Sequence, residues 1–172
     1  MTIRIFFAAA VLLMGGCDGE TLSLGGSNAG DELNKKAIES GVIPDPRNVT
    51  LSGRYETRSE LGTDKFCAVG ESGAQHKIGV LAVFGPESKC EGQGTASIKG
   101  EAINIKLNSQ GRCNFDAEFD GISIRFPGAL PDGCSSYCTP RASLAGTSYF
   151  MVEHGNENAR KALGRDIEKL CS

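Results

Sequence analysis

Apolar and polar residues alternate through four successive segments of the chain, and this pattern constrains the fold more than any other feature of the sequence. The segments are 96–98, 102–107, 113–119 and 122–126. Successive side chains of a β-strand point to opposite faces, so each segment is typical of a strand with one buried face. Because the connections between them are short, the sequence predicts an antiparallel meander.

The connections also predict how these strands pair. Asp120-Gly121 and Lys99-Gly100 have the composition of two-residue hairpin turns, and the loop 108–112 can place Leu107 opposite Cys113. The pairs predicted by the two turns are Phe119 with Ile122, Ala117 with Ile124, Ile98 with Glu101 and Ala96 with Ile103. In nearly every pair the apolar residues share one face, and a slip of one residue would expose them all.

Further elements flank the meander. The alternating segment 51–57, the continuous apolar run 78–84 and the segment 147–153 are each predicted to be strands. Asn156 is positioned to cap a C-terminal helix. The apolar stripe of that helix would be Ala159, Leu163, Ile167 and Leu170. The predicted fold class is therefore mainly β, a small antiparallel meander or barrel with a C-terminal α-helix.

The N-terminal segment has the layout of an export signal. Arg4 precedes an uncharged apolar run, and Gly15-Gly16 then lead into Cys17. The run is shorter than the ~20 residues that a membrane-spanning helix needs. The segment resembles the signal peptide of bacterial membrane lipoproteins, which implies cleavage before Cys17 and lipid on its thiol and new amino terminus. Ordinary secretion with cleavage nearby is the alternative.

The resemblance implies a signal peptide (1–16). The small polar residues that follow it, without apolar periodicity, predict a lipid-anchored flexible tether (17–49), and the strand pattern from Thr50 onward predicts a folded domain (50–172). Within the tether, Asp31–Ser40 is predicted to form a short helix. The protein would be anchored to the cell membrane or the outer membrane and face the periplasm. Asp18 resembles the inner-membrane retention signal of enteric bacteria.

Six cysteines remain after the lipid acceptor, namely Cys67, Cys90, Cys113, Cys134, Cys138 and Cys171. An even number in an exported chain predicts three disulfides. The spacing of Cys134 and Cys138 also suits zinc, but no second cysteine or histidine pair accompanies them. Sequence alone leaves the connectivity open. Cys171 is expected to tie the C-terminal helix to the body, with Cys134 or Cys138 as the favoured partner.

The segment 127–141 interrupts the strand pattern with prolines and two cysteines. A stapled loop loses little conformational entropy on binding, which favours recognition through Leu130, Tyr137 and Arg141. The alternative is that the loop is a clasp that closes one end of the barrel, with Tyr137 packed inward.

Cofactor and catalytic motifs are not evident. The net charge of −3 argues against a nucleic-acid partner. The carboxylates at Asp116, Glu118 and Asp120 resemble the start of a calcium loop, but its twelfth position is Pro127, so no cofactor or metal is expected. His76 and His154 are both expected to be exposed connector residues.

The predicted function is non-catalytic binding by a lipid-anchored envelope protein. The partner would be another envelope protein or a foreign enzyme. The lipid on Cys17 would hold the protein at the membrane. Small lipid-anchored β-barrels that inhibit lysozymes are similar in general layout, without a match to their motif residues. Two alternatives stay open: a periplasmic hydrolase using His154 or His76, and a structural or stress-related envelope lipoprotein.

Overall fold

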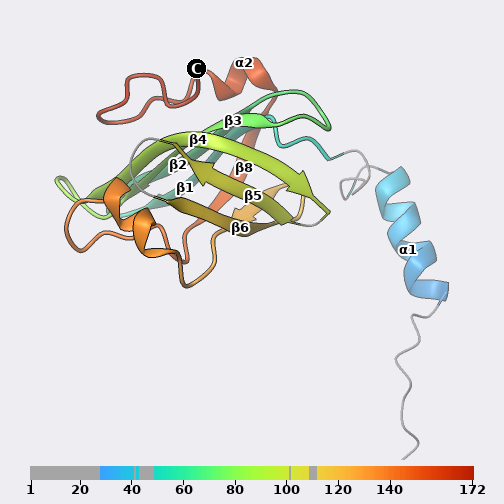
Figure 1. Ribbon diagram of the computed structural model, residues 1–172. Coiled ribbons are helices and arrows are strands. Elements are labelled where there is room, and N and C mark those ends of the chain that lie inside the picture. The colour runs from blue at the N-terminus through green and yellow to red at the C-terminus, as the bar shows by residue number, and fades with distance from the viewer. Residues whose placement is uncertain (1–27, 41, 43–48, 101, 109–111) are drawn as a thin grey trace, which may run out of the picture.

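Eight antiparallel strands form a closed barrel in chain order (Figure 1). The computed structural model describes residues 28–40, 42, 49–100, 102–108 and 112–172. The strands are β1 (Gly53–Ser59), β2 (Gly62–Val69), β3 (His76–Val83), β4 (Lys89–Lys99), β5 (Ala102–Leu107), β6 (Cys113–Phe119), β7 (Ser123–Arg125) and β8 (Ser148–His154). Strand β8 pairs with β1 and closes the barrel. The predicted mainly β, disulfide-stapled fold is confirmed.

The strand registers agree with the predicted ones in part. Leu107 pairs with Cys113 as predicted across the loop 108–112. The two hairpins are displaced by two positions, so that Phe119 pairs with Ile124 and Ile98 with Ile103. A displacement of two keeps every strand residue on its predicted face.

A glycine at the first central position of each turn explains the displacement. Gly121 has a φ of 97° and Gly100 a φ of 64°, a region that glycine adopts without steric cost. The carboxylate of Asp120 also accepts hydrogen bonds from the backbone N–H groups of Ile122 and Ser123, at 3.0 and 2.6 Å. Ile122, which was predicted to be buried opposite Phe119, therefore lies in the turn and is exposed.

Aromatic rings fill the centre of the barrel. The ring of Phe66 lies 5.6 Å from Tyr55 and 5.8 Å from Tyr149, measured between centroids. Phe126 packs against Tyr149 at 5.3 Å and against Phe115 at 4.9 Å. These rings belong to one cluster of buried side chains contributed by all eight strands. The interior is a packed core, as is common for barrels of eight strands.

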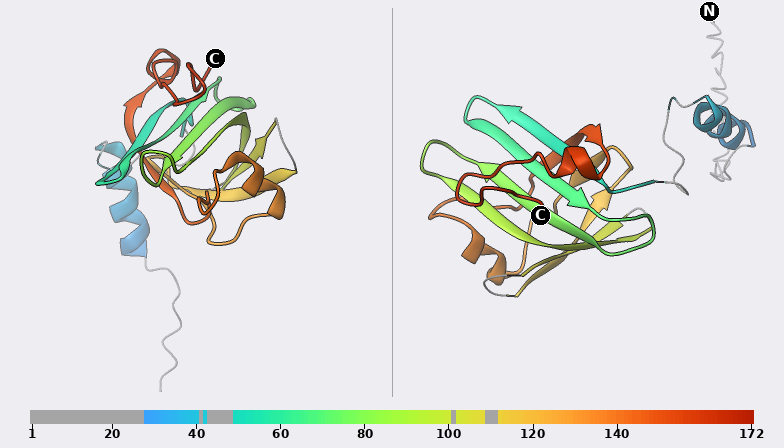
Figure 2. Two further views of the ribbon diagram at one scale, coloured as in Figure 1. Left: turned by 90° about the vertical axis from the view of Figure 1, so that its left-hand side faces the viewer. Right: turned by 90° about the horizontal axis from the view of Figure 1, so that it is seen from above.

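The C-terminal segment 156–172, here called the C-terminal strap, covers the outside of the barrel. Figure 2 shows it lying across the green strands when the molecule is viewed from above. It forms a second buried cluster with the outer faces of β2 and β3, made of Cys67, Val69, Leu81, Val83, Ala159, Ala162, Leu170 and Cys171. Gly79 permits this contact, because a Cβ atom there would lie 2.1 Å from the carbonyl oxygen of Leu170.

The strap is not the predicted helix. Helix α2 (Asn156–Ala159) has one turn, and the chain continues without regular structure. The buried carboxylate of Glu91 on β4 accepts hydrogen bonds from the backbone N–H groups of Arg165, Asp166 and Ile167. In a continued helix these N–H groups would donate to backbone carbonyls of the preceding turn. The predicted helix with an apolar stripe through Leu163 was therefore wrong. Leu163 is exposed.

Three disulfides link Cys67 to Cys171, Cys90 to Cys138 and Cys113 to Cys134. The predicted tie between Cys171 and the body is confirmed. The partner predicted for Cys171, either Cys134 or Cys138, was wrong. The strap lies over β2, which carries Cys67, whereas Cys134 and Cys138 are bonded to cysteines of β6 and β4. All six predicted cysteines are paired.

The N-terminal region is described only in part. Helix α1 (Asn28–Glu39) confirms the short helix predicted in the tether, although it begins three residues earlier than Asp31. Cys17 and the signal segment lie outside the described residues. No helix among the residues that the structure describes is long and apolar enough to cross a membrane.

Candidate binding site

One end of the barrel, here called the loop end, is closed by the long segment 127–147. It lies where β3 ends and where β4, β6 and β8 begin, and it faces the viewer in the left view of Figure 2. The chain enters β1 at the other end, here called the entry end, on the side where helix α1 lies in Figure 1. The loop end and the entry end are therefore on opposite sides of the domain.

Two disulfides and several hydrogen bonds hold the segment 127–147 on the barrel. Cys134, in the short 3-10 helix η1 (Asp132–Tyr137), is bonded to Cys113 at the start of β6. Cys138 is bonded to Cys90 on β4. The N–H of Thr139 donates to the carbonyl of Lys89 at 2.8 Å, and a Ser135 hydroxyl closes the helix turn on Asp132 at 2.7 Å. The loop has little freedom left to lose on binding.

The structure separates the three residues that were predicted to form a recognition loop. Tyr137 is buried and packs into the barrel, where a Cβ atom on Gly92 would lie 2.7 Å from its ring. Leu130 is half-buried against the same core. Arg141 alone is exposed. For Tyr137 the clasp alternative therefore holds, and of the three only Arg141 is exposed to solvent.

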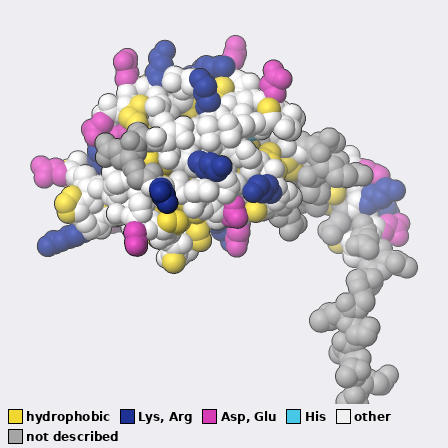
Figure 3. All heavy atoms as spheres, viewed as in Figure 1, with side chains coloured by type: hydrophobic (Ala, Val, Ile, Leu, Met, Phe, Trp, Pro, Cys, Tyr) yellow, Lys and Arg dark blue, Asp and Glu magenta, His cyan; other side chains and the backbone are white. Residues whose placement is uncertain are grey.

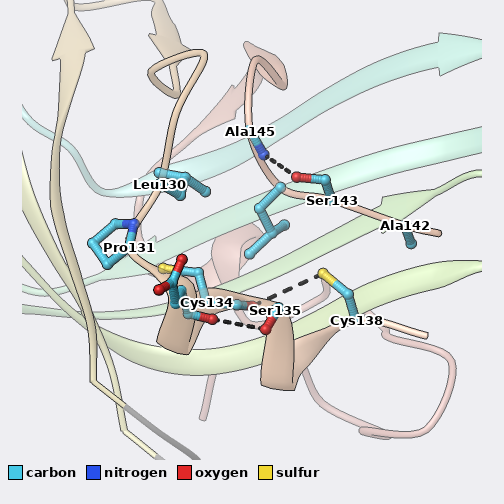
Figure 4. A pocket seen from close by; sticks show the side chains of 10 residues that line it. Leu130, Pro131, Cys134, Ser135, Cys138, Ala142, Ser143 and Ala145 are labelled. Atoms are coloured by element: carbon cyan, nitrogen blue, oxygen red, sulfur yellow. Dashed lines mark hydrogen bonds between the residues drawn. The ribbon is translucent and has the colours of Figure 1, made fainter. Parts of the chain in front are cut away.

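A pocket of about 410 Å³ opens within this segment. Figure 4 shows Leu130 on one side, Ser143 and Ala142 on the other, and Cys134 and Ser135 on the η1 side. Hydroxyls, a carboxylate at Asp132 and aliphatic side chains thus face one hollow. Sequence reasoning missed the residues 142–145, because they lie beyond the cysteine-rich stretch and show no periodicity.

A second, shallower hollow of about 610 Å³ lies beside the first. It is formed by the β3–β4 hairpin, including Phe84 and Pro86, and by Thr139 and Pro140. Cys138 and Ala142 line the first hollow, so the turn 139–142 forms the wall between the two.

The two histidines lie at the entry end, far from these hollows. His76 begins β3 and is completely buried, so its predicted exposure was wrong. The cause is the alternation of β3, which places His76 on the same inward face as Ile78 and Val80. Neither ring nitrogen of His76 has a hydrogen-bond partner among the described residues. His154 ends β8 and is exposed, as predicted.

Burial makes His76 a source of acid sensitivity. Burial lowers the pKa of His76, and the nearby backbone of Ala74 opposes only part of this shift. Above the unfolded-state pKa of about 6.5 both states are neutral, whereas below it the unfolded chain takes up a proton that the folded chain resists. The free energy of unfolding should therefore fall as the pH drops below about 6.5. Denaturant titrations at pH 8 and pH 5 should show a smaller pH effect for His76→Leu, and an equal pH effect in both proteins would contradict this assignment.

The carboxylates that resemble a calcium loop are used within the fold. Asp116 accepts a hydrogen bond from the amide of Asn104 at 2.7 Å. Burial would raise the pKa of Asp120, but hydrogen bonds from Ser123 and Ile122 outweigh it and hold that pKa below its usual range. Among the described residues no group of three or more His, Cys, Asp or Glu side chains could hold a metal ion. Acidic and basic side chains are interspersed over the face drawn in Figure 3.

No protein family, no curated protein and no solved structure matches the chain. Within the described residues, the loop end combines a fixed backbone, two hollows and an exposed cation. It is therefore the candidate site.

Proposed function

We propose that this chain is a lipid-anchored protein of the bacterial cell envelope whose barrel is a non-catalytic binding domain. The partner is another envelope protein or a foreign enzyme that enters the envelope, which the domain would inhibit. The observation that carries the proposal is the rigid loop end, where the disulfides Cys90–Cys138 and Cys113–Cys134 fix a surface with two hollows. Rigid surfaces bind at low entropic cost, and loops held on a stable scaffold often carry binding residues.

Two features of the barrel support binding at its surface. Aromatic rings around Phe66 pack together in the interior of the described barrel, which favours binding at the outer surface over binding inside. The buried ring of His76 is closed off from any substrate, which weakens the hydrolase alternative for that residue. His154 is exposed, but no other feature of the described chain favours catalysis at that position over binding at the loop end.

Anchoring rests on the sequence Gly15-Gly16-Cys17. Three acyl chains, as in the lipoproteins that this segment resembles, would make attachment long-lived, whereas one chain holds a protein only marginally. We expect Cys17→Ser to abolish labelling by radioactive palmitate and to leave an uncleaved precursor. Equal labelling of the wild-type and variant chains would contradict lipid attachment, and Cys171→Ser serves as a control that removes a cysteine elsewhere.

Affinity capture tests the binding function. The full chain, tagged after Ser172, is immobilised and exposed to envelope extract and separately to lysozyme. We expect saturable capture of a defined protein that survives 150 mM salt and washing with excess unrelated β-barrel protein. Capture of nothing above the background would favour the structural or stress-related envelope protein, and turnover of an envelope substrate that His154→Ala abolishes would favour the hydrolase.

A further inference from the structure

The turn between the two hollows has an unusual residue at its tightest position. The N–H of Ala142 donates to the carbonyl of Thr139 at 3.1 Å, which closes a four-residue turn. Pro140 occupies the first central position, where its ring fixes φ near −65°. Arg141 occupies the second, with a φ of 71°. This is a type II turn, whose second central position favours glycine or asparagine.

A second turn in the same loop has glycine at the position that Arg141 occupies in the first. The N–H of Thr147 donates to the carbonyl of Leu144 at 3.3 Å, and Gly146 at the second central position has a φ of 73°. The two turns thus have nearly the same φ at equivalent positions. Arg141 is the one described residue other than glycine with a positive φ. Residues held in sparsely populated backbone regions cluster at binding and active sites.

The structure offers no internal role for the Arg141 side chain. It is exposed, and its guanidinium makes no hydrogen bond or ion pair with another described residue. Some other arginines of the domain have partners: Arg54 pairs with Glu153 at 2.8 Å, and Arg165 donates to the carbonyl of Gly85 at 2.9 Å. The positive φ of Arg141 is therefore not compensated by any side-chain contact among the described residues.

We infer that Arg141 is the anchor of the binding surface and that it enters an acidic cleft of the partner protein, where a carboxylate receives it. This inference rests on the proposed binding function. A guanidinium recognises carboxylate or phosphate through two parallel hydrogen bonds, and arginine is enriched among residues that dominate interface energies. Because Pro140 and the Cys90–Cys138 disulfide hold the turn in place, the side chain is presented from a fixed backbone.

Shape and position favour a protein carboxylate over a lipid phosphate. The turn is the raised wall between two hollows, so the partner must supply the concave surface, and clefts of that kind belong to proteins. The turn also lies at the loop end, opposite the entry end at which β1 begins (Figure 1). The point at which the chain enters the barrel is therefore not beside Arg141.

Four proteins test the inference: the wild-type full chain, R141G, R141K and the control R160Q, which removes an exposed arginine near the entry end. We expect R141G to melt no lower than the wild type, because glycine suits the position. The same variant should bind the purified captured protein at least about 30-fold more weakly. R141K keeps the charge without the planar fork and should lose about tenfold. R160Q should bind within about twofold of the wild type.

Carbodiimide coupling identifies the acceptor group. It should join the new amine of R141K to a carboxylate of the captured protein, at a residue that mass spectrometry locates in a cleft. Equal affinity of R141G and wild type, or a lowered melting temperature of R141G, would overturn the inference while leaving the binding function intact. Arg141-dependent binding to phosphatidylglycerol vesicles would assign the side chain to lipid phosphate instead. Absence of any captured protein would overturn the proposed function and the inference with it.

Discussion

Replacing Cys67 and Cys171 together by alanine should lower the free energy of unfolding by about 4.7 kcal/mol, because this disulfide closes the longest loop, with a sequence separation of 104. In the chain-entropy description, a cross-link stabilises by restricting the unfolded chain, and the effect grows with loop length. Both cysteines are buried, so alanine is preferred to serine, whose hydroxyl would be buried without a hydrogen-bond partner. Denaturant unfolding of the full chain under non-reducing conditions measures the loss.

The disulfide between Cys113 and Cys134 provides the matched control, because its sequence separation is only 21. The same relation gives a loss of about 3.3 kcal/mol for the corresponding pair of alanine substitutions. Hydrogen exchange should also accelerate through the strap in the Cys67 and Cys171 variant, but not in the control. A smaller loss for the Cys67 and Cys171 pair than for the control pair would contradict the structural role assigned to the strap.

Phe66→Ala should destabilise the domain by about 3–5 kcal/mol, the range for removal of a buried phenylalanine ring. Phe66 is fully buried and contacts the rings of Tyr55 and Tyr149, so its loss leaves a cavity at the centre of the barrel. Phe150→Ala is the control, since that ring lies on the outer face of β8 and is 48% exposed. The control should lose less than about 1 kcal/mol. Similar losses for the two variants would contradict a core centred on Phe66.

Local pattern predicted the strands well and their turns less well. Alternation along β5 and β6 identified the buried face and the pairing of Leu107 with Cys113, because both depend on residues close in sequence. The register of each turn depends on whether its glycine takes the first or the second central position. In the turn at Gly121, hydrogen bonds from the N–H groups of Ile122 and Ser123 to the Asp120 carboxylate favour the first. The Asp-Gly dipeptide alone does not distinguish these registers.

Long-range contacts decided what the sequence could not predict. The apolar spacing after Asn156 is helical, but Glu91 on β4 binds the N–H groups that such a helix would need. Only the closed barrel brings Cys67 under the strap, so the partner of Cys171 could not be derived from order along the chain. His76 looked like a polar loop residue until β3 was seen to begin with it.

Two of the three residues predicted for recognition lie at the candidate site, because Leu130 lines a hollow and Arg141 is exposed, whereas Tyr137 is buried. Composition drew attention to the segment 127–141 because cysteines and prolines gather there. Residue type cannot distinguish an exposed tyrosine from one that fills a barrel end, as Tyr137 does above Gly92. The significance of Arg141 lies in its backbone, since a positive φ is invisible in the sequence and is evident beside Gly146.

Amide hydrogen exchange of the full chain, with and without the captured partner, tests most directly whether the loop end is the binding surface. We expect slower exchange on binding in the segment 127–147 and in the β3–β4 hairpin around Phe84, with no change at the entry end near His154. Protection confined to the entry end or to the C-terminal strap, with the segment 127–147 unchanged, would contradict binding at the loop end.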